Sequence, residues 1–308
     1  MEDRLSCWAV SMDKAEIIDR FRVEDGDGFR LKRFDPADTC GLDIDKSEAK
    51  DLLQDGVGRL RDLQERLYAE RRWSVLIVLQ AIDTAGKDST IEHVMSGVNP
   101  QGCEVTSFKA PSSLELRHDF LWRAARALPE RGEIGIFNRS YYEEVLVVRV
   151  HEDLLRKQGL SPKLIGKDIW QERYESIRDF EKHLARNGTV ILKFFLNLSK
   201  DEQRKRFLAR IDEPDKNWKF EPADLAERKH WDDYQKAYQA MIAHTATKHA
   251  PWYVVPADNK WFTRLFVAET IAETLDGLAL DFPKVDDEAR KAMARARKEL
   301  LAEDDKKG

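Results

Sequence analysis

The sequence predicts an α/β protein with a doubly wound parallel sheet, and three observations support that fold class. Residues 73–80 (WSVLIVLQ) and 189–196 (TVILKFFL) are apolar runs without polar alternation, which is typical of strands buried on both faces. Residues 46–71 carry apolar side chains at helical spacing, as expected for a helix laid on the core. The run at 73–80 leads into Gly86-Lys87, after which the chain can start a helix. In such a fold, ligands bind at the carboxyl ends of the strands.

The remaining elements are assigned in chain order. Residues 104–108 form the next predicted strand, followed by a helix that Ser112 opens with Glu115 three positions on, a capping-box pattern. Residues 133–139 form a short buried strand that ends in polar residues. We then expect a basic helix with a second capping box (Ser199 and Glu202), a long amphipathic helix, a strand and a last core helix, at 199–210, 225–244, 252–257 and 261–278.

Composition and charge limit the class of protein. The chain has 308 residues, of which 42% are hydrophobic and 35% charged, enough for one main domain with a sizeable core and a well-solvated surface. We expect an N-terminal arm at 1–45, a main domain at 46–280 and a charged C-terminal tail at 281–308 that forms a solvated helix. The net charge of −5 argues against a generally basic nucleic-acid-binding protein, so no nucleic-acid partner is expected.

Cysteine usage and hydropathy bear on location. Cys7, Cys40 and Cys103 are odd in number and lack metal-ligand spacing, so we interpret them as reduced thiols of a cytoplasmic protein. The first residues lack a basic segment followed by a long apolar core, and no apolar stretch approaches the ~18 residues that a membrane helix needs. We therefore expect no membrane partner.

The segment at 75–90, VLIVLQAIDTAGKDST, predicts a phosphate-binding loop. A strand that feeds a tight loop and a helix presents backbone N–H groups and a positive dipole end to an anion, and Lys87 could reach the next phosphate. The match to G-x-x-x-x-G-K-[ST] is imperfect, because Ala81 stands at the first glycine and Asp88 at the Mg²⁺-binding Ser or Thr. The alternative is an ordinary strand-to-helix turn that contains a lysine.

Polar residues near this loop suit phosphoryl transfer, which needs cations, a carboxylate and in-line positioning. Asp83 could hold an Mg²⁺-bound water or orient the acceptor phosphate, although an aspartate also caps turns. The strand at 133–139 ends in Asn138, where this class of fold usually has an aspartate, so metal binding could pass to Asp83, Glu143 or Glu144. Arg139 suits a phosphate clamp, with a structural salt bridge as the alternative.

A basic segment at 200–219 suggests a lid. Its seven Lys and Arg residues outnumber five Asp and Glu, and Arg206 and Arg210 are four apart on one helix face. The turn at Pro214 could be mobile, so these arginines could close over phosphates, as lids do in phosphoryl-transfer enzymes. The alternative is a solvated helix face.

Together these motifs resemble the polyphosphate kinase 2 family over roughly residues 28–280. The resemblance rests on six segments in order: LKRFDP (31–36), QAIDTAGKDSTI (80–91), GVNPQG (97–102), IFNRSYYEEVLVVRV (136–150), KFFLNLSKDEQRKR (193–206) and APWYVVPA (250–257).

This resemblance implies a thymidylate-kinase-like fold, that is, a P-loop kinase-like three-layer α/β/α arrangement with a parallel sheet and a helical lid at about 199–220. It implies an enzyme that moves the terminal phosphoryl group of inorganic polyphosphate, reversibly, to AMP and ADP, with Mg²⁺ or Mn²⁺ as cofactor; GMP and GDP are further candidate acceptors. Asn138 with Glu143-Glu144 is similar to the subgroup that phosphorylates both AMP and ADP. We also expect a homo-oligomer.

The resemblance further implies residue roles. Asp83, Lys87 and Arg139 would be catalytic. The expected phosphate- and polyphosphate-binding residues are Ala85, Gly86, Lys87, Asp88, Ser89, Arg204, Arg206, Arg210 and Lys219. The expected nucleotide-binding residues are Asn138, Arg139, Glu143 and Glu144, and the expected metal ligands are Asp83 and Glu144.

Two other functions use the same residues. The first is a nucleoside-monophosphate kinase with ATP as donor, which the same fold supports. The second is a non-catalytic polyphosphate-binding or nucleotide-sensing protein, in which Asn138 marks lost chemistry.

Overall fold

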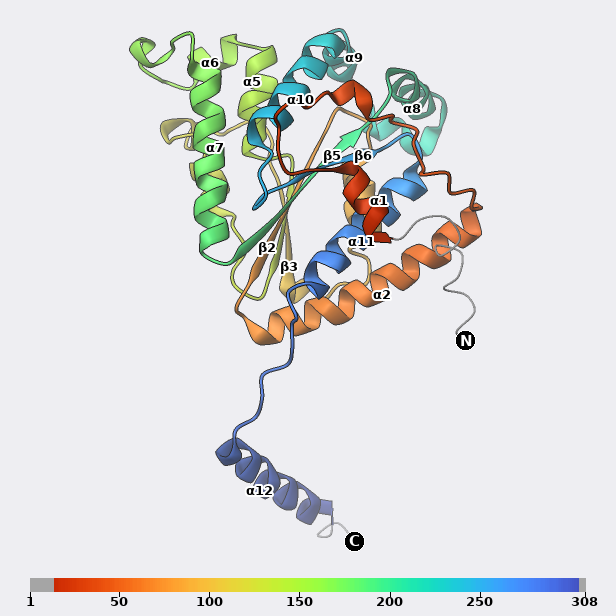
Figure 1. Cartoon of the computed structure of the whole chain (residues 1–308), viewed down its shortest axis with the longest axis vertical. Helices are drawn as coiled ribbons and strands as arrows, with labels where there is room; N and C mark the ends of the chain where they lie inside the picture. The colour runs from red at the N-terminus through yellow and green to blue at the C-terminus, as the bar shows by residue number, and fades with distance from the viewer. Residues whose placement is uncertain (1–13, 305–308) are drawn as a thin grey trace.

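The computed structural model describes residues 14–304, and in this part of the chain six strands form one sheet (Figure 1). The strands are β1 (Arg22–Val23), β2 (Ser74–Ala81), β3 (Cys103–Ser107), β4 (Ile134–Asn138), β5 (Thr189–Asn197) and β6 (Trp252–Pro256). Their order across the sheet is β1-β6-β5-β2-β4-β3. All neighbours pair in parallel except β1, which runs antiparallel to β6.

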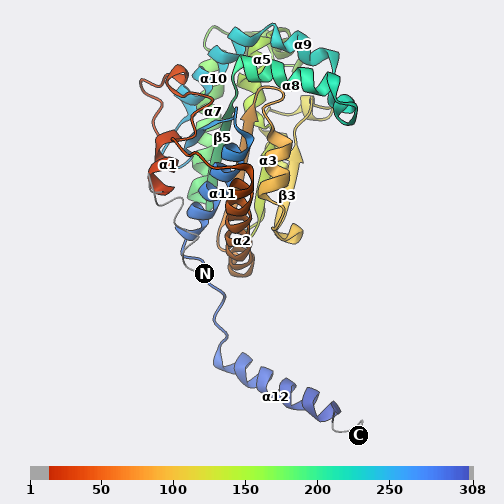
Figure 2. The same ribbon diagram turned by 90° about the vertical axis from the view of Figure 1, so that its right-hand side faces the viewer.

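Helices cover both faces of this sheet, which makes three layers (Figures 1 and 2). The helices α2, α3 and α11 pack together on one face, and α5, α7 and α10 pack together on the other. The helix bounds are α1 (Lys14–Phe21), α2 (Lys46–Glu70), α3 (Lys87–Val94), α4 (Trp122–Arg126), α5 (Val147–Val150), α6 (Asp153–Lys157), α7 (Ile169–Arg186), α8 (Lys200–Asp212), α9 (Pro222–Arg228), α10 (Trp231–Thr245), α11 (Lys260–Asp276) and α12 (Asp287–Asp304).

Local chemistry explains the principal elements. The helix α2 begins after Asp45, whose side chain accepts hydrogen bonds from the N–H groups of Ser47 and Glu48 at 2.7 and 2.9 Å. It ends at Arg71, which takes a left-handed conformation with φ of 54°. All eight residues of β2 are buried, as expected for the central strand of a sheet covered on both faces. The predicted α/β fold class is confirmed.

The N-terminal arm differs from the expectation. Residues 14–23, which were expected to form part of an N-terminal arm outside the main domain, form α1 and then β1, which adds an antiparallel edge strand through the pair Arg22 and Tyr253. The apolar side chains of α1 explain this docking, because Ile17 and Phe21 are buried in the core and the Phe21 ring packs edge-on against that of Phe266.

Cys7 lies outside the described residues; Cys40 and Cys103 are free thiols, and burial raises the pKa of each to about 11.

Two predicted helices also differ in extent, and one helix was not predicted. The capping box of Ser112 and Glu115 forms, but it opens only a 3-10 turn at Glu115–Arg117. The long helix expected at 225–244 is split into α9 and α10: α9 has no buried residues and contacts α8 through Asp224 and Arg210, whereas α10 buries apolar side chains in the core. No helix was predicted where α7 lies; its buried face includes Tyr174, Ile177 and Leu184.

The C-terminal tail forms the solvent-exposed helix α12, as predicted, and it stands apart from the rest of the molecule in both views (Figures 1 and 2). Among the described residues, no helix is both long enough and apolar enough to span a membrane.

The strand order places the predicted site. After the edge strand β1, the chain forms the central strand β2, passes to β3, returns to β4 between them, and continues to β5 on the other side of β2. Ligands bind at such a switch point, where the connections after neighbouring strands diverge. In the register of β2 and β4, Leu79 lies opposite Asn138, so the segments that follow these strands meet at one edge of the sheet.

Candidate active site

The loop at 82–86 connects β2 to α3 at this edge. Gly86 precedes α3 with φ of 103°, a conformation that a residue with a side chain rarely adopts. Thr84 has φ of 67°, which is uncommon for a β-branched residue and persists only where the surroundings hold the backbone. Ala85 is buried, and the Ser89 hydroxyl in the first turn of α3 donates to the Gly86 carbonyl at 3.3 Å. The loop is therefore tightly built, and the N-terminus of α3 points to its concave side.

Lys87 is buried at the base of the loop. Its Nζ donates to the Ala81 carbonyl at the end of β2, at 2.8 Å, and approaches the Ile82 carbonyl at 3.5 Å. Burial lowers the pKa of Lys87, and the nearby Asp83 carboxylate opposes that shift. Because Lys87 is poorly hydrated, its charge should interact more strongly with a bound phosphate than the charge of an exposed lysine would.

Asp83 and Arg139 bridge the two strand ends. The Arg139 guanidinium donates to Asp83 Oδ1 at 3.1 Å. Arg139 takes φ of 63°, while its backbone N–H donates to the Leu79 carbonyl at 3.1 Å. Burial lowers the pKa of Arg139, but Glu143 and Asp83 raise it by more. Strained backbone at two neighbouring positions, Thr84 and Arg139, is typical of functional sites.

Asp88, one of the two departures from the usual phosphate-loop motif, contacts the unusual amide at the end of β4. The Asn138 amide donates to Asp88 Oδ1 at 2.5 Å, across the ends of β4 and α3. The carboxylate expected on the strand thus lies on the helix, and an amide takes its place on the strand. The pair keeps one negative charge beside the loop, which the sequence alone did not reveal.

The side chains of Glu143 and Glu144 lie in different surroundings, although the two residues are adjacent in the 3-10 turn Tyr141–Val145. Glu143 lies toward the loop: burial raises its pKa, and the neighbouring Arg139 and Lys87 oppose that shift. The Gln80 amide reaches Glu143 Oε1 at 2.9 Å when it is oriented so that its oxygen accepts from Ser140, at 3.0 Å. We adopt this orientation because it gives both ends of the amide a suitable partner.

Glu144 lies on the other side of this turn. It is 5% exposed, accepts from the Gln158 amide at 2.5 Å and lies 3.6 Å from the Arg173 guanidinium. Successive residues of a turn point in different directions, so the expected metal pair of Asp83 and Glu144 is corrected: Glu143 is the glutamate near Asp83. Glu144 instead lines a cavity of about 300 Å³ together with Phe120, Leu164 and Arg173.

The raised pKa of Glu143 predicts a pH effect. A carboxyl group whose pKa is higher in the folded than in the unfolded protein stabilises the fold at low pH, and this stabilisation is lost as the pH rises through its folded-state pKa. We expect Glu143→Gln to remove this loss, so that the variant gains stability relative to the wild type between pH 5 and pH 8. Urea unfolding at both pH values measures the difference; a constant difference would contradict the prediction.

The predicted lid arginines have separate environments. Arg204 is exposed, and its nearest acidic partner is Asp201 at 3.9 Å. Arg210 donates to Asp224 of α9 at 3.2 Å and to the Lys219 carbonyl at 3.1 Å. Lys219 is exposed, with its Nζ 4.9 Å from the centre of the Trp218 ring.

Arg206 does not face solvent as a lid residue would. It is 8% exposed, and its guanidinium donates to Thr84 O and Ala85 O of the loop and to Ala257 O and Asp258 O after β6. The expectation that Arg206 closes over phosphates is corrected, because its side chain lies under the loop. The predicted capping box is also modified: Ser199 Oγ accepts from the Glu202 N–H, but the Glu202 carboxylate accepts from Arg206 Nε at 3.0 Å.

Asp224, which contacts Arg210, lies near the candidate site and was not predicted there. Burial raises its pKa, and Asp83 raises it further, which places Asp224 in the electrostatic surroundings of the loop. The only signal in the sequence is its place after the basic segment, which does not distinguish it from the neighbouring acids.

The carboxylates at this site suit a divalent cation that substrate phosphates also bind. Among residues 14–304, no three carboxylate, histidine or cysteine side chains converge in a way that could hold a metal alone. Mg²⁺, however, is usually bound by one or two carboxylates together with substrate phosphates and water. Asp83, with Asp88 nearby in the first turn of α3, supplies that kind of donor.

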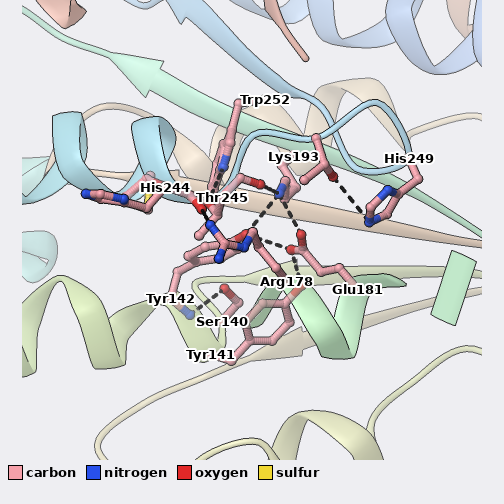
Figure 3. A network of polar contacts seen from close by, with 12 residues as sticks. Ser140, Tyr141, Tyr142, Arg178, Glu181, Lys193, His244, Thr245, His249 and Trp252 are labelled. Carbon is pink, nitrogen blue, oxygen red and sulfur yellow. Dashed lines mark hydrogen bonds and ion pairs between the residues drawn. The ribbon is translucent and has the colours of Figure 1, made fainter. Parts of the chain in front are cut away.

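A buried ion pair supports the residues that follow Arg139 (Figure 3). Lys193 of β5 and Glu181 of α7 are both fully buried, with Nζ and Oε2 2.7 Å apart. Lys193 also donates to Tyr142 Oη and to the Thr245 carbonyl, each at 2.9 Å. Glu181 Oε1 accepts from the hydroxyls of Tyr141 and Tyr142 at 2.9 and 2.7 Å. The pair thereby anchors the turn that carries Glu143 to α7 and β5.

Breaking this pair should be severe, since it leaves a buried charge without its partner. We expect Lys193→Met to lower the free energy of unfolding by about 3–5 kcal/mol. The double variant Lys193→Met with Glu181→Gln keeps an acceptor for the tyrosines without a buried charge, and it should recover much of that loss. Urea unfolding of both variants tests this, and equal destabilisation of the two would argue against the ion pair as the cause.

Three comparisons with known proteins agree. The family model described as Polyphosphate kinase 2 (PPK2) matches residues 43–282. A protein of Rhodopseudomonas palustris named ADP-polyphosphate phosphotransferase is 53% identical over 92% of this chain and 98% of its own length. A Meiothermus ruber protein named AMP/ADP-polyphosphate phosphotransferase is 49% identical over 86% of this chain and 95% of its own. The crystal structure of polyphosphate kinase 2 from Arthrobacter aurescens superposes with a TM-score of 0.82 at 42% identity, covering 93% of this chain and 98% of that one.

Proposed function

This chain belongs to the polyphosphate kinase 2 family, and from that premise we propose that it transfers the terminal phosphoryl group of inorganic polyphosphate to ADP and to AMP. The observation that carries the proposal is the meeting of Lys87, Asp83 and Arg139 where β2 and β4 end. Two cations and a carboxylate at one point suit a reaction whose transition state is stabilised by position and charge.

The proposed reaction conserves the phosphate units. An oxygen of the terminal phosphate of ADP or AMP attacks the terminal phosphorus of polyphosphate and forms a new P–O bond. The bond from that phosphorus to the bridging oxygen breaks, and its electron pair stays on the polyphosphate, which becomes one unit shorter. The bound Mg²⁺ would neutralise the phosphate oxygens and hold them in line. Lys87 and Arg139 would then stabilise the charge that develops on the moving group.

The two substrates are assigned to different sides of the loop. We place the acceptor phosphate at Arg139, next to Asn138, with the nucleoside toward the cavity that Glu144 lines. The donor is placed over Gly86 and the N-terminus of α3. Arg204, Arg210 and Lys219 stay candidates for contact with the distal part of the donor.

A cluster of cations beside α3 supports this donor path. Arg264 of α11 donates to Ser89 Oγ at 3.4 Å, while its buried Nε has no hydrogen-bond partner in the described part of the chain. Burial lowers the pKa of Lys260, and the neighbouring Arg206, Arg264 and Lys216 lower it further. Arg206 is paired with Glu202 and Lys216 with Glu213, but within residues 14–304 no carboxylate forms a salt bridge with Lys260 or Arg264. Two such cations close together favour a polyanion.

We expect Lys260→Met to raise the KM for long polyphosphate by about fivefold, as the loss of one charged contact of about 1 kcal/mol would give. The kcat should stay close to that of the wild type, and the KM should depend less steeply on salt. Steady-state kinetics with long chains and with tripolyphosphate measure the effect. Lys236→Met, at an exposed position of α10, is the control. An equal rise for tripolyphosphate would contradict a contact with the distal chain.

The function itself is tested with purified protein, Mg²⁺ or Mn²⁺, polyphosphate and either ADP or AMP. The expected products are ATP and ADP, respectively. Running GMP and GDP in parallel tests the breadth of acceptors. Product from ATP and AMP, with none from polyphosphate, would support an ATP-dependent nucleoside-monophosphate kinase instead. Binding of polyphosphate without turnover at any metal or chain length would support a non-catalytic protein.

A further inference from the structure

Two side chains of α8 hold three successive carbonyl groups of the loop. The Gln203 amide donates to the Asp83 carbonyl at 3.1 Å. Arg206 Nη1 donates to the carbonyls of Thr84 and Ala85 at 3.1 and 3.0 Å. We call this set of contacts the α8 tie. These carbonyls belong to the residues around Thr84, whose left-handed backbone needs such support.

Every donor of Arg206 is used. Its Nη2 donates to the carbonyls of Ala257 and Asp258 at 2.7 and 3.1 Å, and its Nε donates to Glu202 at 3.0 Å. A guanidinium has five N–H donors, and all five have acceptors in the protein. A phosphate could therefore bind Arg206 only after it displaced a carbonyl from a buried site. The donors instead join α8, the phosphate loop and the loop that begins α11.

The orientation of Gln203 is also set. Its side-chain oxygen accepts from Arg228 of α9, so its amide nitrogen is the end that faces the Asp83 carbonyl. The helix α9 is thus linked to the phosphate loop through one side chain of α8.

The α8 tie determines where the loop's N–H groups point. In a trans peptide, the C=O group and the following N–H group point in opposite directions. Carbonyls of residues 83–85 that face α8 therefore turn the N–H groups of residues 84–86 away from it. The Ala85 N–H approaches the Ile82 carbonyl at 3.3 Å, and no acceptor within residues 14–304 takes up the N–H groups of Thr84 and Gly86. These two groups are available to an anion.

From this geometry we propose that Gln203 and Arg206 are positioning residues for phosphoryl transfer. They orient the phosphate loop before the substrate arrives and do not bind the substrate themselves. A donor set aimed in advance at the developing charge needs no reorganisation during the reaction, which is where such groups contribute most. The proposal rests on the proposed function for its kinetic consequences, but its structural part can be tested without turnover.

The kinetic test uses Arg206→Lys, which keeps the charge but not the fork of donors needed for four carbonyls. We expect kcat to fall by about 10- to 100-fold, because small displacements of positioned groups have effects of that size. The KM for polyphosphate and its salt dependence should stay within about twofold of the wild type, since no phosphate contact is lost. Gln203→Met removes the side-chain amide that donates to the Asp83 carbonyl, and it should also lower kcat. Arg61→Lys, at an exposed position of α2, is the control.

The structural test is amide hydrogen exchange in the loop. Arg206→Lys should speed exchange in the peptide that covers residues 82–87 and leave β5 unchanged. This result is expected whether or not the wild type uses polyphosphate, so it separates the present proposal from the proposed function. If Arg206→Lys does not fold, Gln203→Met serves for both measurements.

Two results would overturn the proposal. A raised KM for polyphosphate with a shallower salt dependence and an unchanged kcat would make Arg206 a phosphate ligand. Wild-type kinetics together with wild-type exchange in the loop would show that the α8 tie has no positioning role.

Discussion

Replacement of Lys87 with alanine is expected to lower kcat by about a thousandfold, the upper range for loss of one preorganised charge donor. Lys87 is 9% exposed and lies at the root of the loop, where its Nζ contacts only backbone carbonyls. Such a charge is available to the transferring phosphate and is poorly screened by water. Initial rates of ATP formation from ADP and polyphosphate measure the change.

The same position allows a check on the cause. Lys87→Arg keeps the positive charge, but a planar guanidinium does not reproduce the compact ammonium that donates to the Ala81 and Ile82 carbonyls, so it should also be strongly impaired. Lys236→Ala, on the exposed face of α10, should retain the wild-type rate. Because Lys87→Ala leaves the Ala81 carbonyl without its partner, urea unfolding should accompany the kinetics. A kcat within tenfold of the wild type would contradict the assigned role.

Replacement of Asp83 with asparagine should lower kcat by about a hundredfold. Asparagine has nearly the same shape and can still accept from Arg139, so the fold should be retained while the charge is lost. That charge balances both Arg139 and the buried Lys87. Without it, the two cations repel each other and the metal loses a carboxylate.

The two roles considered for Asp83 give different kinetic patterns. If Asp83 holds the metal, the variant should need more Mg²⁺ for half-maximal rate, and Mn²⁺ should partly restore turnover. If it orients the acceptor through Arg139, the KM for ADP should rise at constant metal affinity. Calorimetric titration of Mn²⁺ into wild type and variant provides a binding measurement independent of turnover. A variant with wild-type rate and metal dependence would exclude both roles.

Sequence patterns predicted the elements around the candidate site well where the information is local. The burial of β2, the turn at Gly86 and the position of Lys87 before a helix follow from a continuous stretch of chain, so they could be read in order. The carboxyl ends of neighbouring parallel strands lie at one edge of a sheet, which is why Asn138 and Arg139 could be placed near Asp83 before any contact was known.

Sequence patterns failed where the question was in which direction a side chain points. Glu143 and Glu144 are chemically identical in sequence, and the choice between them depends on which face of a short 3-10 turn meets the loop. That choice follows from the hydroxyl contacts of Tyr141 and Tyr142 with Glu181, a residue of α7 that no local pattern connects to the site. Arg206 is a similar case, since a basic helical residue could face solvent, phosphate or carbonyl groups.

The sequence by itself determined the α/β fold, the family and the position of the candidate phosphate-binding loop, because apolar periodicity, turn chemistry and ordered motifs are properties of contiguous residues. Only the tertiary structure decided which polar groups meet. It paired Asp88 with Asn138, turned Glu144 away from the loop, and placed Arg206 beneath it. Those outcomes depend on strand order and on how α7 and α8 pack. Buried polar groups must find partners wherever the fold brings them, and those partners are far away in the chain.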